Sequence, residues 1–276
     1  MGLDPSSDRE GARRENRPPD GEVQQLLRGL PELHLVGRFA SSSNATFLAW
    51  LGSHVPDRSL LRKIEDDPCW DSLRGDGMLT VYKPRRGESP LWDFPSGTLC
   101  LREVAAHHLA RELGWPRIPP TVLRSAGPFG TGSLQLFVDA QPGIRHLDDG
   151  AVPAERWLEI AAFDVLSNNA DRKGGHFLLD EKGTLWAIDH GLTFHVDPKL
   201  RTILWEYAGD PLPAELRPGL ERAVRGLRGA RLGRVLGRWL DSDEMAILER
   251  RARQMLDPGW RFPPPRSRRA VPWPPV

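Results

Sequence analysis

Two carboxylates flank a short stretch of this chain that has the spacing of a phosphoryl-transfer site. Asp171 lies in a polar loop. After it come an apolar segment at 177–179, a polar turn at 180–183 and a second apolar segment at 185–188. Asp189 follows directly, two residues before Gly191. A hairpin of this length would bring both carboxylates to one end. One carboxylate could orient or deprotonate an attacking hydroxyl, and the other could hold the Mg²⁺ that neutralises phosphate charge. We expect Asp171 in the first role and Asp189 in the second, although each half alone is also an ordinary turn.

A lysine and a glutamate upstream could complete such a site. Lys83 ends the β-prone run 78–83 in a chain that has five lysines and a large excess of arginines. A compact ammonium suits contact with α- and β-phosphates, and the alternative is a solvated lysine at the end of a strand. Glu103 lies in 101–113, where apolar residues recur at helical spacing before Gly114, a plausible C-cap. Glu103 could orient Lys83, or be an acid favoured by the helix dipole in the first turn.

A small polar turn between the apolar segments 33–39 and 45–50 is the candidate phosphate cover. Backbone N–H groups in such a turn can approach phosphate oxygens. The turn matches neither a Walker loop nor a G-x-G-x-x-G fingerprint. Its position between two apolar segments, rather than its composition, is therefore the reason to expect it over the phosphates. Its residues are Ser41, Ser42, Ser43 and Asn44. The run 133–140 reads as a buried strand that continues into a loop.

Together, the segments 81–90, 102–106, 168–179 and 185–191 resemble the phosphatidylinositol 3-/4-kinase-like superfamily, most closely the type II phosphatidylinositol 4-kinases. HipA-type and secretory-pathway protein kinases are similar at greater distance, and the chain also resembles an actinobacterial family of kinase-like proteins. The likeness covers roughly residues 35 to 210. It implies an α+β, two-lobed protein-kinase-like fold, with a small β-rich N-lobe and a larger, mostly helical C-lobe. It also implies ATP with Mg²⁺ or Mn²⁺ as cofactors, and an adenine-binding hinge at Leu136, Phe137 and Val138.

The same resemblance assigns Asn169 and Arg172 to the catalytic loop beside Asp171, but the chain departs from the pattern at the second metal position. His176 stands where the group usually has Asn. Imidazole is a poorer ligand for Mg²⁺ than an amide oxygen, though it suits Mn²⁺ or Zn²⁺. This departure leaves open a Mn²⁺ preference, a single-metal reaction, or a protein that binds nucleotide without turnover.

Composition and patterning suggest how the chain is organised. Residues 1–21 are expected to be disordered, 22–140 to form the N-lobe with an insertion at 53–77, 141–261 to form the C-lobe, and 262–276 to be a Pro-rich tail. A net charge of +1 argues against nucleic acid as a partner. The two cysteines match no metal-binding pattern and are too few for a disulfide scaffold. The sequence shows neither a signal peptide nor a transmembrane run, and together these features predict a cytoplasmic protein.

The function expected from these features is transfer of the γ-phosphate of ATP to a hydroxyl acceptor, either a protein or a small molecule. The main alternative is an inactive nucleotide-binding regulatory module. A lipid kinase, an AMP-transferase, or a Zn²⁺ hydrolase built on Asp171, His176, Asp189 and His190 is ranked lower. A basic stripe on an amphipathic helix after residue 210 could contact anionic lipid headgroups or an acidic partner, or simply be solvated. Its arginines are Arg222, Arg225, Arg228, Arg231, Arg234 and Arg238.

Overall fold

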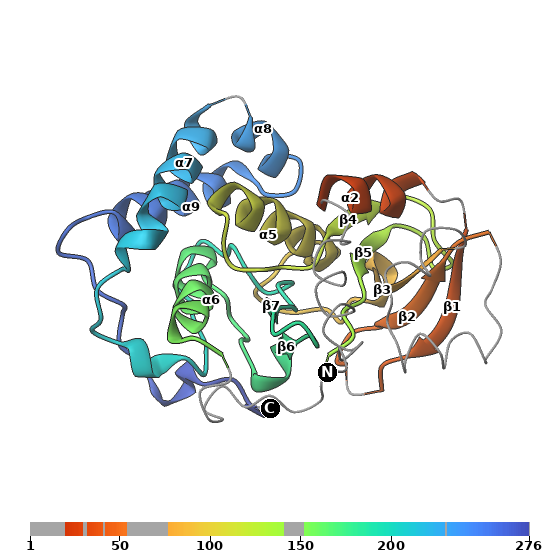
Figure 1. Ribbon diagram of the computed structural model, residues 1–276, viewed down its shortest axis with the longest axis horizontal. Helices are drawn as coiled ribbons and strands as arrows, with labels where there is room; N and C mark the ends of the chain where they lie inside the picture. The colour runs from red at the N-terminus through yellow and green to blue at the C-terminus, as the bar shows by residue number, and fades with distance from the viewer. Residues whose placement is uncertain are drawn as a thin grey trace, which may run out of the picture.

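The computed structural model has an α+β, two-lobed protein-kinase-like fold, and it describes residues 20–29, 32–40, 42–53, 77–140, 152–229 and 231–275 (Figure 1). The N-lobe is built on an antiparallel sheet in the order β1-β2-β3-β5-β4. Its strands are β1 (Leu33–Arg38), β2 (Phe47–Leu51), β3 (Met78–Pro84), β4 (Thr121–Arg124) and β5 (Gly132–Leu136). Helices α2 (Asp20–Gly29) and α5 (Leu99–Leu113) pack against its β4–β5 side.

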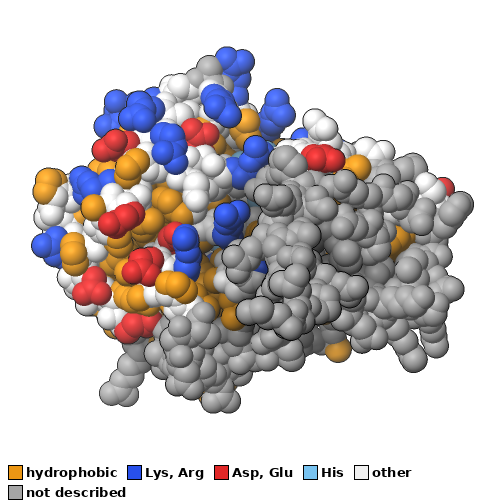
Figure 2. All heavy atoms as spheres, in the orientation of Figure 1, with side chains coloured by type: hydrophobic (Ala, Val, Ile, Leu, Met, Phe, Trp, Pro, Cys, Tyr) orange, Lys and Arg blue, Asp and Glu red, His pale blue; other side chains and the backbone are white. Residues whose placement is uncertain are grey.

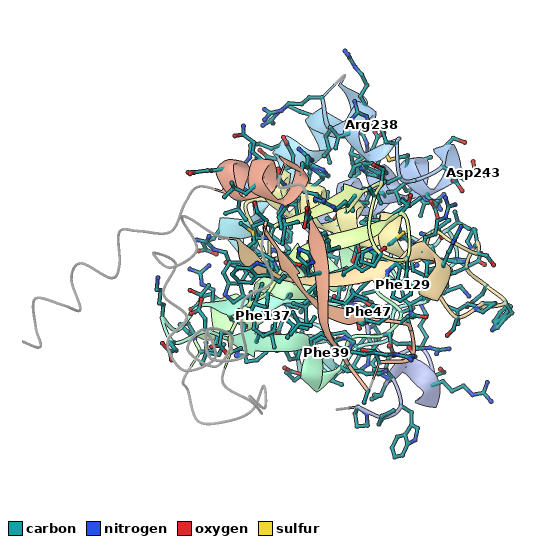
Figure 3. The ribbon with its side chains drawn as sticks, turned by 90° about the vertical axis from the view of Figure 1, so that its right-hand side faces the viewer. Phe39, Phe47, Phe129, Phe137, Arg238 and Asp243 are labelled. Carbon is teal, nitrogen blue, oxygen red and sulfur yellow. The ribbon has the colours of Figure 1, made fainter. Side chains whose placement is uncertain are left out.

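Strand β3 occupies the centre of the sheet and carries Lys83 at its end. Thr80 and Tyr82 are buried on one face, and Lys83 pairs in register with Ser133 of β5. Pro84 then ends the strand, because proline cannot donate to the ladder. At one side of the sheet, Phe47 and Phe129 stack with ring centroids 5.0 Å apart (Figure 3). The sheet therefore holds Lys83 at a fixed position.

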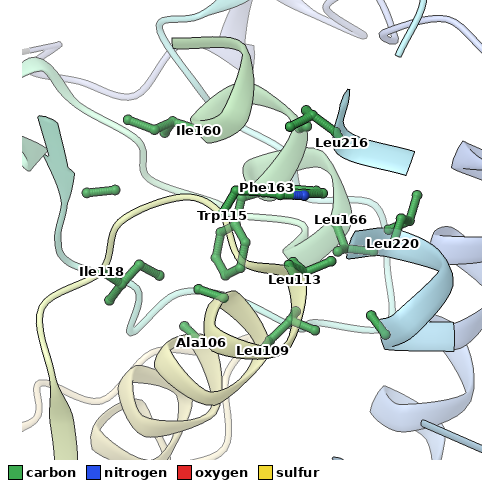
Figure 4. Close-up of a cluster of buried hydrophobic side chains, with 14 of the residues drawn as sticks. Ala106, Leu109, Leu113, Trp115, Ile118, Ile160, Phe163, Leu166, Leu216 and Leu220 are labelled. Carbon is green, nitrogen blue, oxygen red and sulfur yellow. The ribbon is translucent and has the colours of Figure 1, made fainter. Parts of the chain in front are cut away.

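The C-lobe contains α6 (Ala154–Ser167), the hairpin β6 (Phe177–Leu179) and β7 (Leu185–Ala187), and the helices α7 (Arg217–Arg228), α8 (Leu232–Leu236) and α9 (Ser242–Met255). Its core joins α5, α6 and α7 through side chains that include Leu109, Phe163 and Leu220 (Figure 4). Gly219 permits the closest approach, since a Cβ there would lie 2.2 Å from the Leu113 carbonyl oxygen. None of the described helices is both long enough and apolar enough to cross a bilayer.

Two expectations about organisation need adjustment. The basic stripe does not lie on one helix: α7 ends at Arg228, α8 begins at Leu232, and Arg238 lies beyond both, because extended backbone at Gly229 interrupts the helix. Basic side chains nevertheless gather over α7 and α8 (Figure 2). Strand β5 ends at Leu136 and the chain continues without strand structure through 137–140, as the predicted strand followed by a loop requires. Helix α2 begins at Asp20, inside the segment expected to lack structure, and the predicted insertion lies almost wholly outside the described residues.

The C-terminal tail packs across the C-lobe. Phe262 and Ala270 are buried, and the Thr202 amide donates to the Ala270 carbonyl at 3.0 Å. Further along, the Gly174 amide donates to the Pro275 carbonyl at 2.8 Å. The tail thus reaches the loop that carries Asp171, although its described residues, up to 275, include just one short 3₁₀ turn, at Arg268–Ala270.

Candidate active site

Three charged side chains from distant parts of the chain meet where the lobes join. Lys83 at the end of β3 forms an ion pair with Glu103 of α5, and its Nζ lies 2.9 Å from Oδ1 of Asp189, which follows β7. The second oxygen of Glu103 accepts a hydrogen bond from the His190 amide at 3.0 Å. Because Glu103 is only 3% exposed, this buried carboxylate holds both Lys83 and the turn that carries Asp189.

The electrostatics of this cluster favour a charged lysine. Burial lowers the pKa of Lys83, but the carboxylates of Asp189 and Glu103 outweigh burial, so the pKa is raised overall. Partial burial acts to raise the pKa of Asp189, but the Lys83 ammonium outweighs it and holds the pKa below the usual range. Burial raises the pKa of Glu103 despite its pairing with Lys83. Lys83 and Asp189 are therefore both ionised at neutral pH.

Asp189 adopts a backbone conformation that few residues tolerate. Its φ of 60° lies in the left-handed region, where Asp is enriched among non-glycine residues. Its side chain is 48% exposed, whereas the neighbouring His190 is buried. Such strain persists only where surrounding contacts hold it, and it is common at functional sites. The turn thus presents the carboxylate to solvent beside Lys83.

Asp171 lies in the loop that follows α6. Its amide donates to Oδ1 of Asn169 at 3.0 Å, and its carboxylate lies 2.9 Å from Nζ of Lys173. Burial raises the pKa of Asp171, the Lys173 ammonium lowers it, and the charge of Asp189 adds to the rise. The two carboxylates therefore interact at the same end of the hairpin.

Arg172 and Asn169 hold this loop in place from inside the protein. Arg172 is fully buried, and its Nε and Nη2 each donate to the Asp164 carboxylate at 3.0 Å. It also donates to the Ile188 carbonyl at 2.7 Å, just before Asp189. Asn169 donates to Asp164 at 2.9 Å. Neither side chain has exposed surface, so Arg172 and Asn169 hold the loop that carries Asp171 through buried contacts, and their part in catalysis stays a prediction.

Asp164 and Lys173 were not among the residues selected from the sequence. The available signal for Asp164 was one acid inside the otherwise apolar run 160–166. A charge in a buried helix face needs a buried partner, and the nearby Arg172 is that partner. For Lys173, the one available signal was its position two residues after Asp171 in the sequence.

His176 lies beside Asp189 but is also tied to the loop. Its Nε2 is 3.4 Å from Oδ2 of Asp189, and its Nδ1 accepts from the Lys173 amide at 3.4 Å. Burial lowers the pKa of His176 to about 4, although Asp189 acts to raise it. The ring is thus neutral at pH 7, the form in which imidazole binds metals.

The donor set fits a metal that also binds phosphate. Asp189 and His176 bring a carboxylate and a neutral imidazole together, and Mg²⁺ or Mn²⁺ commonly takes its other ligands from nucleotide phosphates and water. Among the described residues, no three His, Cys, Asp or Glu side chains are grouped to hold an ion. The Nε2 of His190 lies 2.8 Å from Nη2 of Arg172. The described residues therefore do not bring together the ligands that the four-residue zinc alternative requires.

The structure describes most of the residues expected to form the nucleotide cover and the hinge. Asn44 accepts from the Ser89 amide at 2.7 Å through its side chain, and the Ser43 carbonyl accepts from the Ser89 hydroxyl at 3.0 Å. The turn containing Ser42 is therefore fastened to the segment that follows Lys83, while Ser41 lies outside the described residues. Leu136 ends β5, and the Phe137 amide donates to the Leu79 carbonyl at 3.1 Å. Contact of these residues, or of Val138, with nucleotide remains a prediction.

Comparison with known proteins places the fold in the protein-kinase-like class. The crystal structure of the Golgi casein kinase with Mn/ADP bound matches 86% of this chain and 74% of its own chain, with a TM-score of 0.53 and 17% identity. No family model matches. Protein Rv2133c of Mycobacterium tuberculosis is 37% identical over 281 residues, which cover 88% of this chain and 92% of that protein. The chain belongs to the same family as Protein Rv2133c.

More distant similarity extends to plant proteins named as lipid kinases. Phosphatidylinositol 4-kinase gamma 4 of Oryza sativa subsp. japonica is 31% identical over 140 residues, or 43% of this chain and 25% of the plant protein. Phosphatidylinositol 4-kinase gamma 2 of Arabidopsis thaliana is 25% identical over 68% of this chain and 38% of its own length. The chain thus spans well under half of these plant proteins.

Proposed function

We propose that the protein is an ATP-dependent phosphotransferase that moves the γ-phosphoryl group to a hydroxyl acceptor. The observation that carries the proposal is the contact of Lys83 with both Glu103 and Asp189. A buried glutamate that fixes one lysine beside an exposed aspartate is the arrangement needed to bind phosphates and a divalent ion together. The Golgi casein kinase structure, which holds Mn and ADP, supports the same nucleotide chemistry.

In this proposal, each side chain has a separate task. Asp171 accepts the proton of the acceptor hydroxyl as its oxygen bonds to the γ-phosphorus. The bond from that phosphorus to the β–γ bridging oxygen breaks, and ADP leaves with the electron pair. Lys83 compensates phosphate charge. A divalent ion held by Asp189 and His176 would neutralise the developing charge on the phosphate oxygens. Arg172 keeps the two loops in register.

The second candidate is a nucleotide-binding regulatory module, and it is favoured by one observation. The Nδ1 of His176 accepts from the Lys173 amide, so in that neutral tautomer Nε2 carries the proton and faces Asp189. A protonated nitrogen cannot bind metal, so a ligand role for His176 requires the other tautomer. Both candidates therefore predict nucleotide binding, but only the phosphotransferase predicts transfer of phosphate.

Nucleotide binding is tested first by thermal unfolding. A ligand that binds only the native state adds about 2.7 kcal/mol at a concentration one hundred times its dissociation constant. We expect stabilisation by ATP together with Mg²⁺ or Mn²⁺, and less by ATP alone. Absence of a shift with either ion would exclude both candidates.

Catalysis is then separated from binding with two matched substitutions. Asp189→Asn should weaken metal–nucleotide binding and abolish transfer of labelled phosphate. Asp171→Asn should leave ATP affinity nearly intact and lower transfer by about 10²- to 10⁴-fold, the usual contribution of a positioned base. Asp243→Asn, at an exposed carboxylate on α9, is the control for loss of one charge. Transfer by Asp171→Asn at the control rate would rule out the assigned role of Asp171. An inactive wild type that binds ATP would favour the regulatory module.

A further inference from the structure

A large cavity opens beside Asp171. Its volume is about 890 Å³, within the size range of small-molecule sites. Its walls come from the 91–94 segment, the loop 192–205, helix α9 and the tail 263–270. Asp171 lines this cavity, whereas Lys83 and Asp189 do not. If Lys83 and Asp189 bind nucleotide, as proposed above, the cavity lies on the acceptor side of Asp171.

The cavity wall has more positive than negative side chains. Its carboxylates are Asp93, whose Oδ2 lies 2.8 Å from Nζ of Lys199, and Asp171, which pairs with Lys173. The remaining cations have no ion pair with any carboxylate in the described part of the chain. They are Arg201, Arg250, Arg251, Arg266 and Arg269. An excess of cations in a hollow concentrates anions there.

Arg201 is fixed directly beside the reacting loop. Its amide donates to the Asn169 carbonyl at 2.9 Å, and its carbonyl accepts from the Arg172 amide at 3.0 Å. These two backbone bonds bracket Asp171. The Arg201 side chain is exposed and lines the cavity, so its guanidinium is available to a ligand that reaches Asp171.

Arg251 adds a cation with an unused donor. Its Nη2 donates to the His195 carbonyl at 2.6 Å, whereas its Nη1 is buried without a hydrogen-bond partner. Burial, and then the neighbouring Arg250, lower the pKa of Arg251 to about 10. A buried donor without an acceptor is unfavourable, and an anionic oxygen in the cavity would satisfy it. Arginine also matches phosphate geometry better than lysine does.

The same cavity has aromatic walls. Trp92 is 93% exposed at its edge, and Lys199 Nζ lies 4.8 Å from the centre of the Trp92 ring. Trp205 and Trp260 also line the cavity. Apolar ring faces beside a few charged groups are typical of sites for ligands with both a carbon framework and polar substituents.

We propose that this cavity binds the acceptor of the transfer reaction, and that the acceptor is a phosphate-bearing alcohol. Its phosphate would be bound by arginines that line the cavity, among them Arg201, Arg250 and Arg251, while a free hydroxyl reaches Asp171. The hydroxyl oxygen bonds to the γ-phosphorus of ATP, its proton goes to Asp171, and ADP leaves. A soluble polyol phosphate and a phospholipid headgroup share this chemistry.

Binding without nucleotide tests the cavity independently of transfer. Calorimetry on the full chain would compare glycerol, glucose and inositol with glycerol 3-phosphate, glucose 6-phosphate and inositol 1-phosphate. Vesicles of phosphatidylcholine, with and without phosphatidylglycerol, provide the lipid arm. We expect at least one phosphorylated ligand to bind tenfold or more tightly than its parent. The double variant Arg201→Gln, Arg250→Gln should lose that preference.

The matched control is Arg225→Gln, an exposed arginine on α7 that does not line the cavity. Thermal unfolding of each variant checks that the exposed substitutions leave the fold intact. The proposal is overturned if phosphorylated ligands and vesicles bind no better than their parents, or if the double variant binds as the control does. Preference for vesicles identifies a headgroup, and preference for free phosphates identifies a soluble acceptor.

The two proposals fail in different ways. Phosphate-dependent binding without any ATP binding would refute phosphotransfer and leave the cavity assignment standing. ATP binding and transfer to acceptors irrespective of their phosphate would refute the cavity assignment alone. With ATP and metal present, the double variant should raise KM for the phosphorylated acceptor at least tenfold and leave ATP affinity unchanged.

Discussion

Substitution of Asp164 by Asn should destabilise the protein far more than loss of a surface charge. Asp164 and Arg172 are both fully buried, and the carboxylate accepts from two guanidinium nitrogens at 3.0 Å. Asparagine keeps the shape but leaves Arg172 as a buried charge without a counter-ion. Removing one partner of a buried pair costs about 3–5 kcal/mol. That loss is large against a typical stability of about 5–15 kcal/mol.

The expected change is readily measured. For a domain of this size, 1 kcal/mol corresponds to about 2–4 °C in Tm, so Asp164→Asn should lower Tm by about 6–20 °C. The control is Glu249→Gln, because Glu249 pairs with the exposed Arg228 and Arg253. Such surface pairs contribute at most about 1 kcal/mol. Circular dichroism during thermal unfolding at constant pH compares the three proteins.

Asp164→Asn should also affect function at temperatures at which the variant is still folded. Arg172 connects the Asp171 loop to the Ile188 carbonyl, so loosening it should separate Asp171 from Asp189. We expect folded Asp164→Asn to bind ATP with metal more weakly and to transfer phosphate more slowly than wild type. If Asp164→Asn lowers Tm by no more than about 4 °C relative to wild type, as a surface pair would, the ion pair does not carry the stability assigned to it.

Three further results are expected. His176→Asn should move the metal preference from Mn²⁺ toward Mg²⁺, measured as the ratio of nucleotide affinities; an unchanged ratio would show that His176 does not bind the ion. Burial raises the pKa of Asp171 and Lys173 lowers it, so the carboxylate needed for transfer is lost as pH falls through that pKa. Lys173→Met should therefore shift the acid limb of the kcat–pH profile to higher pH, and an unmoved limb would contradict this electrostatic role. Gly219→Ala should lower stability by about 1–3 kcal/mol, since the added Cβ lies 2.2 Å from the last carbonyl oxygen of α5. Gly21→Ala, with open space around it, should be neutral or stabilising by denaturant unfolding, and equal losses would refute the steric argument.

Local features of the fold could be predicted from sequence because their causes are local. Helical periodicity ahead of Gly114 predicted α5, and the structure ends that helix at Gly114 with a φ of 84°. The turn at 180–183 predicted the β6–β7 hairpin, which pairs Leu179 with Leu185. The pairing of Glu103 with Lys83 was one of two possibilities left open by the sequence, and the resemblance to the kinase-like group favoured it; the structure forms the pair. For α5 and the hairpin, residue type, spacing and backbone preference suffice.

Tertiary packing decided what separated segments do to one another. The pairing of Arg172 with Asp164, both fully buried, could not be read from either residue alone. The zinc alternative required four side chains to meet, and no three His, Cys, Asp or Glu side chains are grouped among the described residues. The cavity beside Asp171 combines segments from 91 to 270, and no local pattern marks it. Hydrophobic periodicity specifies which face of an element is buried, whereas partners, exclusion of water and side-chain charge states depend on which elements meet in space.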